Sequence, residues 1–292
     1  MKICEKLKRG TPTLSFEVFP PKPEVSDLQG IYRTIDALQQ FRPDFISVTY
    51  GAGGNGAKGT VALASDVQNR SGITALAHLT CVGSSKADVA AHLAELKANG
   101  IENVLALRGD LPEGGTRTGD FRYAADLVAE IKKTGGFCIG AACYPEGHIE
   151  CPHREDDIAH LKDKVDRGVD FLTTQMFFDN SVLYSFLYRA MARGIEVPVI
   201  AGIMPVTNGK MIARACALSG ATLPNRFRRI VDRYGEDPDA MKQAGIAYAT
   251  EQIVDLLANG VRGIHVYTMN KPDVAKAISD NLSHLISGDG KN

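Results

Sequence analysis

The sequence lacks a large net charge, a long apolar run and any Cys-x-x-Cys pair. Its 33 lysine and arginine residues nearly balance its 34 aspartate and glutamate residues, which leaves a formal charge of -1. So small a charge attracts neither nucleic acid nor an anionic membrane, and we expect small-molecule partners, with no nucleic acid and no membrane. Residues 1–13 carry charges where a signal peptide needs an apolar stretch, and no later run approaches the roughly 18 apolar residues of a membrane span. We therefore expect a cytoplasmic protein.

Cysteine is scattered along the chain rather than grouped in pairs. The six cysteines belong to a chain too large to need disulfides, so we interpret them as reduced thiols. One local group contains Cys143, His148, Cys151 and His153, but its spacing matches no usual zinc-ligand pattern. We expect no metal site.

Short β-branched or apolar runs recur along the chain, each followed by a polar loop. They are residues 13–19, 44–50, 73–80, 103–108, 137–143, 170–175, 197–203 and 263–267. Most midpoints are about 30 residues apart, which suits one strand and one helix per step. Eight such units predict a single (β/α)8 TIM-type barrel, an α/β fold that makes residues 1–292 one catalytic domain. The last step, about 65 residues, predicts an extra helical insert between strands 7 and 8, around residues 224–234 and 237–257.

Alternate residues of a barrel strand face the lumen, and here polar side chains collect on one of the two faces. The lumen-facing sets are Ser15 with Glu17, Ser47 with Thr49, Leu76 with His78 and Thr80, Thr173 with Gln175, and His265 with Tyr267. Active sites of such barrels lie at the C-terminal ends of the strands, which makes candidates of Glu17, Thr49, Asp110, Tyr144, Gln175 and Tyr267.

A glycine-rich segment at residues 51–56 matches the dinucleotide pattern Gly-x-Gly-x-x-Gly after a strand. That pattern also needs an acidic residue about twenty positions later, and the run at 73–80 offers none. We therefore favour a barrel loop whose backbone comes close to a ligand.

Glu17 lies between aromatic and aliphatic neighbours in the segment LSFEVFPP. Desolvation there would raise its pKa, so that it holds a proton near neutral pH and acts as a general acid. The alternative is a carboxylate that caps the strand end or pairs with a lysine. We favour the acid, because burying an unpaired carboxyl without a function is costly.

Two further segments allow either a binding or a structural interpretation. Arg108, Gly109 and Asp110 offer a cation, a bare backbone and an anion, which suit a planar heterocycle or simply form a turn. Gln175 either binds a pterin-like or nicotinamide edge or bonds to strand backbone. Lone histidines such as His78 and His148 are more often satisfied structural residues than catalysts.

Eight segments, in order along nearly the whole chain, resemble the methylenetetrahydrofolate reductase family. They are FEVFPPK at 16–22, SVTYGA at 47–52, HLTC at 78–81, ALRGDLP at 106–112, YPEGH at 144–148, TQMFFD at 174–179, GIMPV at 202–206 and HVYTMN at 265–270. The resemblance implies an FAD-containing (β/α)8 barrel that reduces 5,10-methylenetetrahydrofolate to 5-methyltetrahydrofolate with NADH or NADPH. In the implied ping-pong scheme, nicotinamide and folate use one site in turn.

The resemblance also implies residue roles, by position in the family motifs. Glu17 would protonate N10 of the folate, and the anion of Asp110 would favour the cationic iminium that follows. Folate contacts would come from Asp110, Gln175, Tyr267 and Lys271, with Gln175 also contacting nicotinamide. The implied cofactor contacts are Thr49, Tyr50, Ala52, His78, Arg108, Gly109, Asp110, Tyr123, Ala124, Tyr144, His148, Asp157 and Lys164. Arg108 and Lys164 would supply cations for the pyrophosphate.

Three positions depart from the family pattern. Gly209 stands where an aromatic ring would wall the site, Asp163 where an FAD-contacting arginine is expected, and Lys271 where arginine would bind a carboxylate. The first two keep open a non-catalytic or partner-dependent folate-binding subunit, and the fold keeps open an FAD barrel of the proline dehydrogenase type. The choice between NADH and NADPH also stays open. The resemblance suggests a homo-oligomer, and because the chain ends at Asn292 we expect no C-terminal regulatory domain.

Overall fold

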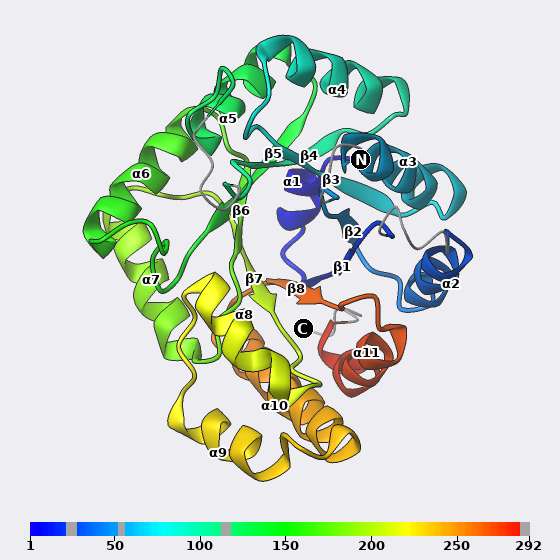
Figure 1. The fold of residues 1–292 in the computed structure, drawn as a ribbon, viewed down its shortest axis with the longest axis vertical. Coiled ribbons are helices and arrows are strands. Elements are labelled where there is room, and N and C mark those ends of the chain that lie inside the picture. The colour runs from blue at the N-terminus through cyan, green and yellow to red at the C-terminus, as the bar shows by residue number, and fades with distance from the viewer. Residues whose placement is uncertain (22–27, 52–55, 112–117, 287–292) are drawn as a thin grey trace.

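Eight parallel strands form a closed barrel in chain order, surrounded by helices, in a computed structural model that describes residues 1–21, 28–51, 56–111 and 118–286 (Figure 1). The strands are β1 (Thr13–Val18), β2 (Phe45–Val48), β3 (Thr74–Thr80), β4 (Asn103–Leu107), β5 (Cys138–Cys143), β6 (Phe171–Thr174), β7 (Val199–Ile203) and β8 (Gly263–Tyr267). Each strand lies within one of the predicted runs. The predicted (β/α)8 barrel is therefore confirmed.

Helices follow the strands and pack an apolar face on the barrel. They are α2 (Leu28–Gln39), α3 (Gly56–Ser65), α4 (Lys86–Ala98), α5 (Ala124–Thr134), α6 (Arg154–Asp166), α7 (Asn180–Ala192), α10 (Pro238–Ala258) and α11 (Pro272–Ile286). The start of α4 is fixed by a capping box, in which Ser85 and Asp88 satisfy each other's backbone N–H groups. Of the helices in the described ranges, none is long and apolar enough to cross a membrane.

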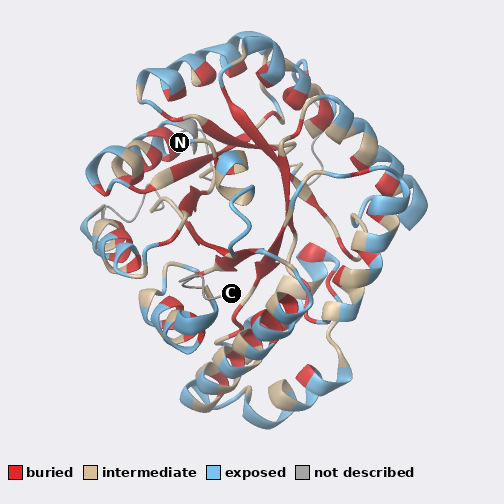
Figure 2. Ribbon diagram, turned by 180° about the vertical axis from the view of Figure 1, so that it is seen from behind, coloured by how far each residue is buried: buried red, intermediate tan, exposed pale blue. Residues whose placement is uncertain are grey.

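Successive side chains of each strand alternate between the core under the outer helices and the lumen of the barrel, as the alternation predicted from the sequence requires. Leu14, Phe16 and Val18 of β1 belong to the large core between the barrel and the outer helices. Ser15 and Glu17 of the same strand are also buried, on the lumen side. Because both faces of each strand are covered, most strand residues are buried (Figure 2).

A short N-terminal helix, α1 (Ile3–Leu7), closes the N-terminal end of the barrel, and the sequence analysis did not predict it. Its Ile3 is completely buried in a cluster with lumen residues such as Phe45 and Phe171. The Ile3 N–H donates to Asn103 Oδ1 at 2.8 Å. Figure 2 shows this helix lying across the barrel opening. Within the described residues, α1 therefore covers the lumen at this end.

The long segment between β7 and β8 contains three α-helices, α8 (Ile212–Ser219), α9 (Asn225–Tyr234) and α10. Helix α10 packs on the barrel as the ordinary helix of the seventh β/α unit, since Ala249 and Ile253 belong to the main core. Helices α8 and α9 are the additional ones. They lie beside α10 (Figure 1), and Phe227 of α9 is buried in a separate small cluster with Ile212 of α8 and Met241 of α10.

Candidate active site

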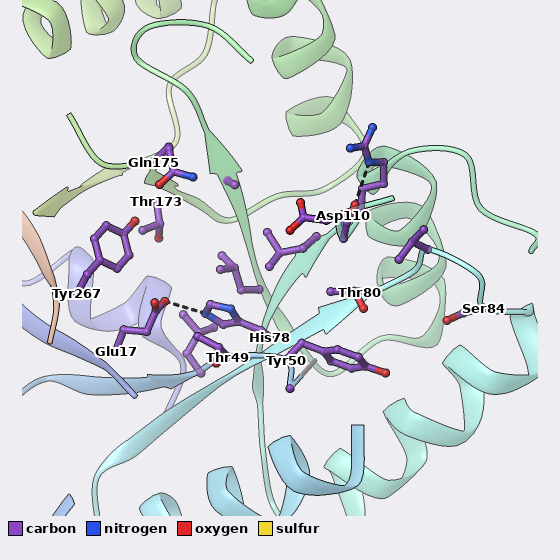
Figure 3. Close-up of a pocket in the computed structure, with 18 of the residues that line it drawn as sticks. Glu17, Thr49, Tyr50, His78, Thr80, Ser84, Asp110, Thr173, Gln175 and Tyr267 are labelled. Atoms are coloured by element: carbon purple, nitrogen blue, oxygen red, sulfur yellow. Dashed lines mark hydrogen bonds and ion pairs between the residues drawn. The ribbon is translucent and has the colours of Figure 1, made fainter. Parts of the chain in front are cut away.

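A cavity of about 1100 Å³ opens at the C-terminal ends of the strands. The predicted site residues that line it are Glu17, Thr49, Tyr50, His78, Arg108, Gly109, Asp110, Tyr144, His148, Gln175 and Tyr267. Figure 3 shows Glu17, Gln175 and Tyr267 on one side of this cavity and Asp110 across from them. The barrel therefore brings together residues that are up to 250 positions apart in the chain.

Other predicted site residues lie outside the cavity lining. Tyr123, at the start of α5, is exposed to solvent, and Ala124 follows it. Lys271, after β8, donates from Nζ to Thr207 Oγ1 at 2.8 Å and so bridges two loops at the rim. Ala52 falls outside the described residues.

Asp157 and Lys164, both on α6, lie behind the cavity wall rather than in it. Lys164 Nζ donates to the backbone oxygen of Ala142 at 2.6 Å, and Ala142 is part of the wall. Burial lowers the pKa of Lys164, although Cys143 and Asp157 oppose the shift. Burial raises the pKa of Asp157, opposed by His148, which does line the cavity. A buried amine therefore lies just behind the wall.

Glu17 is the most enclosed carboxyl of the cavity, with 7% of the residue exposed. Its Oε2 lies 3.5 Å from His78 Nε2, 3.7 Å from His265 Nε2 and 3.4 Å from Ser47 Oγ. Strand register explains the arrangement, because β1 pairs Glu17 with Ser47 on one side and with Tyr267 on the other. Figure 3 shows the carboxyl group pointing at His78.

The expected rise in the pKa of Glu17 is wrong for this structure. Burial alone would raise the pKa, but the His265 imidazole, His78 and Ser47 together lower it below its ordinary value. For the same buried cluster, burial lowers the pKa of His78 to about 4, with Glu17 opposing the shift. Glu17 is therefore a carboxylate at neutral pH, next to a neutral His78. The sequence indicated that the Glu17 carboxyl is desolvated, but it did not indicate the histidine and serine partners whose effect on the pKa exceeds that of desolvation.

Tyr267 and Gln175 are held by backbone contacts at the cavity edge. The Tyr267 hydroxyl donates to the backbone oxygen of Thr174 at 2.6 Å. Gly202 makes this contact possible, since a Cβ on it would lie 2.4 Å from both Thr174 O and the Tyr267 hydroxyl oxygen. Gln175 Oε1 accepts from the Met176 N–H at 2.9 Å, which leaves the amide nitrogen directed into the cavity (Figure 3).

Arg108 forms a bidentate ion pair at the cavity wall. Its Nη1 and Nη2 each lie 2.6 Å from a carboxylate oxygen of Glu150, in the fork geometry that also binds phosphate. This hydrogen bond raises the pKa of Arg108. The neighbouring Gly109 has φ +88°, a conformation that glycine adopts without strain.

The structure also places Asp163 and Gly209, the other two departures from the family pattern. Asp163 lies on the outer side of α6, 57% exposed, and pairs with Arg167 at 3.0 Å. It does not line the cavity, so it does not reverse the sign of charge there. Gly209 packs against Gly235 at the end of α9, and a Cβ on it would lie 2.6 Å from Gly235 Cα. An aromatic side chain at 209 would require these two backbones to separate.

Some cavity residues were not singled out for function from the sequence. His265 was placed on the lumen face of β8 but given no role, although it lies within reach of Glu17. Lys58, Ser84 and His92 line the opposite part of the cavity, from α3 and α4 and the loop before it. For His265 the strand parity was a usable signal, whereas the other three lie on loops and helices that carry no such periodicity.

The chain matches the protein family described as Methylenetetrahydrofolate reductase over residues 2–283. It is 35% identical over 275 residues to the 5,10-methylenetetrahydrofolate reductase of Pectobacterium carotovorum subsp. carotovorum, covering 94% of this chain and 91% of that protein. It is also 35% identical over 301 residues to Methylenetetrahydrofolate reductase (NADH) 1 of Arabidopsis thaliana, covering 97% of this chain and 51% of the plant protein. The chain thus spans about half the length of this plant relative.

A solved structure has the same fold at much lower sequence identity. It is an uncharacterized protein from Clostridium thermocellum, described as binding two copies of 5-methyl-5,6,7,8-tetrahydrofolic acid. The TM-score is 0.63 at 13% identity, over 95% of this chain and 98% of that chain. Identity this low supports a shared fold and no more.

Proposed function

The chain belongs to the methylenetetrahydrofolate reductase family, and from this premise we propose that it reduces 5,10-methylenetetrahydrofolate to 5-methyltetrahydrofolate, using FAD and a nicotinamide donor. The observation that supports this most is Glu17, a buried carboxyl at the end of β1 that opens onto the cavity. A reaction that must protonate a ring nitrogen of its substrate needs such a group within reach.

The cavity suits a flavin together with a second planar ligand. Its volume of about 1100 Å³ is slightly larger than the roughly 300–1,000 Å³ typical of sites for one small molecule. Buried Thr173 Oγ1 and His78 Nε2 have no hydrogen-bond partner within the described part of the chain, and both residues line the cavity. These atoms, the Gln175 amide and the Arg108 guanidinium would hold the flavin. Bound FAD would supply the hydride chemistry that no protein side chain provides.

The residues themselves would bind, orient and protonate the folate. Glu17 moves a proton to N10, which opens the bridged five-membered ring. The Asp110 carboxylate, across the cavity from Glu17, favours the positive charge that then develops on the folate. The Gln175 amide nitrogen and Tyr267 orient the pterin edge from the other side. Because Glu17 is ionised in the free protein, its proton must come from elsewhere before or during the reaction.

The Arabidopsis relative carries NADH in its name, and we propose NADH, with NADPH as the alternative. Both would occupy the cavity that the folate uses later, which gives a ping-pong sequence.

Anaerobic spectroscopy of the full-length protein tests this function. FAD-reconstituted protein should bleach on addition of NADH or NADPH, and 5,10-methylenetetrahydrofolate should restore the flavin absorbance. A protein that takes up no FAD, or that is bleached by neither donor, contradicts the proposal and favours a non-catalytic subunit. Bleaching without folate-dependent reoxidation favours a different flavin barrel.

Substitution of the proposed acid separates the two half-reactions. Glu17→Gln should leave bleaching by the nicotinamide intact and slow folate-dependent reoxidation by about 10²- to 10⁴-fold. Glu196→Gln, on an exposed loop before β7, is the matched control and should change neither rate. An equal loss in both half-reactions of Glu17→Gln would show that the carboxyl is not a specific proton donor.

A further inference from the structure

A buried row of polar side chains lies beneath Glu17, on the lumen faces of β1, β2 and β8. Ser15 Oγ lies 2.8 Å from His265 Nδ1, and Ser47 Oγ lies 3.2 Å from His265 Nε2. Ser47 Oγ also contacts Glu17 Oε2 at 3.4 Å. His265 is 2% exposed, and Phe45 stacks on its ring with the centroids 5.8 Å apart. The row therefore connects Glu17 to a histidine that solvent hardly reaches.

The contacts of this row allow an arrangement of hydrogens in which His265 is doubly protonated. In this arrangement Ser15 donates its one hydroxyl hydrogen to the backbone oxygen of Ile264 at 3.1 Å and accepts from His265 Nδ1. Ser47 donates its only hydrogen to Glu17 and accepts from His265 Nε2. Both ring nitrogens then carry a hydrogen, and a positive ring faces the Glu17 carboxylate.

We propose that His265 stores the proton that Glu17 delivers to the substrate, and that Ser47 passes it between them. The inference rests on the proposed function. In the step, His265 Nε2 gives its proton to Ser47 Oγ, the Ser47 hydroxyl hydrogen moves to Glu17 Oε2, and Glu17 protonates N10 of the folate. His265 ends neutral with its hydrogen on Nδ1, Glu17 ends as a carboxylate, and a proton from water reloads the row. No electrons leave the row, since the hydride comes from the nicotinamide donor through the cofactor.

The other titratable groups that face this row do not serve as the store. His78, from β3, lies 3.5 Å from Glu17, but its pKa of about 4 keeps it neutral near pH 7. Tyr267, from β8, packs edge-on against the His265 ring with the ring centroids 5.3 Å apart. Its hydroxyl hydrogen is donated to the backbone oxygen of Thr174. Its pKa is raised by burial and by Glu17. That leaves His265 as the basic group of the described lumen that Ser47 links to Glu17.

Nitrogen NMR of the histidine rings tests the stored proton directly, without substrate or cofactor. The wild-type His265 ring should carry protons on both nitrogens at pH 7, with its signals assigned by their loss in His265→Asn. In Glu17→Gln the ring should become neutral at pH 7, because the carboxylate that stabilises the imidazolium is gone. A His265 ring that is neutral in the wild type between pH 6 and 8 overturns the proposal.

The two half-reactions test the relay. His265→Asn keeps a donor toward Ser15 but cannot store a proton, and Ser47→Ala breaks the path while leaving His265 in place. Each should slow folate-dependent reoxidation by about 10- to 100-fold and move its pH profile, with bleaching by NADH unchanged. His284→Asn, on the exposed side of α11, is the control. Wild-type rates and an unmoved pH profile in both variants overturn the relay. Failure of the folate to reoxidise the flavin of the wild type would instead contradict the proposed function. The NMR experiment would still show whether His265 is doubly protonated, because it needs neither substrate nor cofactor.

Discussion

The ion pair between Arg108 and Glu150 leads to a quantitative prediction about cofactor affinity. The Arg108 side chain is 16% exposed and the Glu150 side chain 41%, with both guanidinium contacts at 2.6 Å. If Arg108 holds the pyrophosphate of FAD, it must exchange this carboxylate for a phosphate oxygen. Glu150→Gln removes the competing charge and should therefore tighten FAD binding.

The size of this effect follows from the geometry of the pair. Exposed ion pairs contribute about 0.2–1 kcal/mol, and a bidentate pair with one nearly buried partner belongs at the upper end of that range. Removing about 1 kcal/mol of competition lowers the Kd for FAD roughly 5-fold. The gain should shrink as salt rises, since one of the two partners is open to solvent.

Flavin fluorescence during titration of the apoprotein measures this Kd. Glu155→Gln is the matched control, because Glu155 is 66% exposed and reaches Arg193 only at 3.5 Å. It should leave the Kd unchanged. An unchanged or weaker affinity in Glu150→Gln would show that Arg108 keeps its carboxylate partner and does not bind the cofactor.

Three further perturbations test the site and the fold. Gly202→Ala should displace Tyr267 and raise the KM for the folate about 3- to 10-fold, the cost of one hydrogen bond, without changing bleaching by NADH; an unchanged KM would exclude Tyr267 from folate binding. The pKa of His78 is lowered from 6.5 to about 4, so between these two pH values the unfolded chain binds a proton at His78 and the folded chain does not. The free energy of unfolding should therefore fall as the pH drops from 6.5 to about 4. The loss is at most about 3 kcal/mol. Urea unfolding at several pH values should show a weaker pH dependence of the free energy of unfolding in His78→Gln than in the wild type. The same pH dependence in both proteins would contradict the assignment. Ile3→Ala should lower the free energy of unfolding by about 2–5 kcal/mol because Ile3 is buried under the barrel, while Ile149→Ala, at an exposed position, should change it by less than about 0.5 kcal/mol.

Strand periodicity is the reason that the barrel was predictable. A parallel strand buried on both faces needs a short apolar run, and a helix of fixed approximate length must follow before the next one. Parity within each run then decides which side chains face the lumen, as Leu14 and Ser15 illustrate on the two faces of β1. These are local rules, so the sequence alone determined the fold class, the end of the barrel where the cavity opens and part of the lining of that cavity.

The tertiary structure decided the charge states and partners of those residues. The pKa of Glu17 depends on His78 and His265, which are 61 and 248 positions away in the chain but meet it in the lumen. Arg108 forms an ion pair with Glu150, which lies in the loop after the next strand, β5. Helix α1 closes the barrel through contacts that no sequence periodicity predicts. Electrostatic interactions fall off with distance in space, not along the chain, so only the closed barrel determines which of them act.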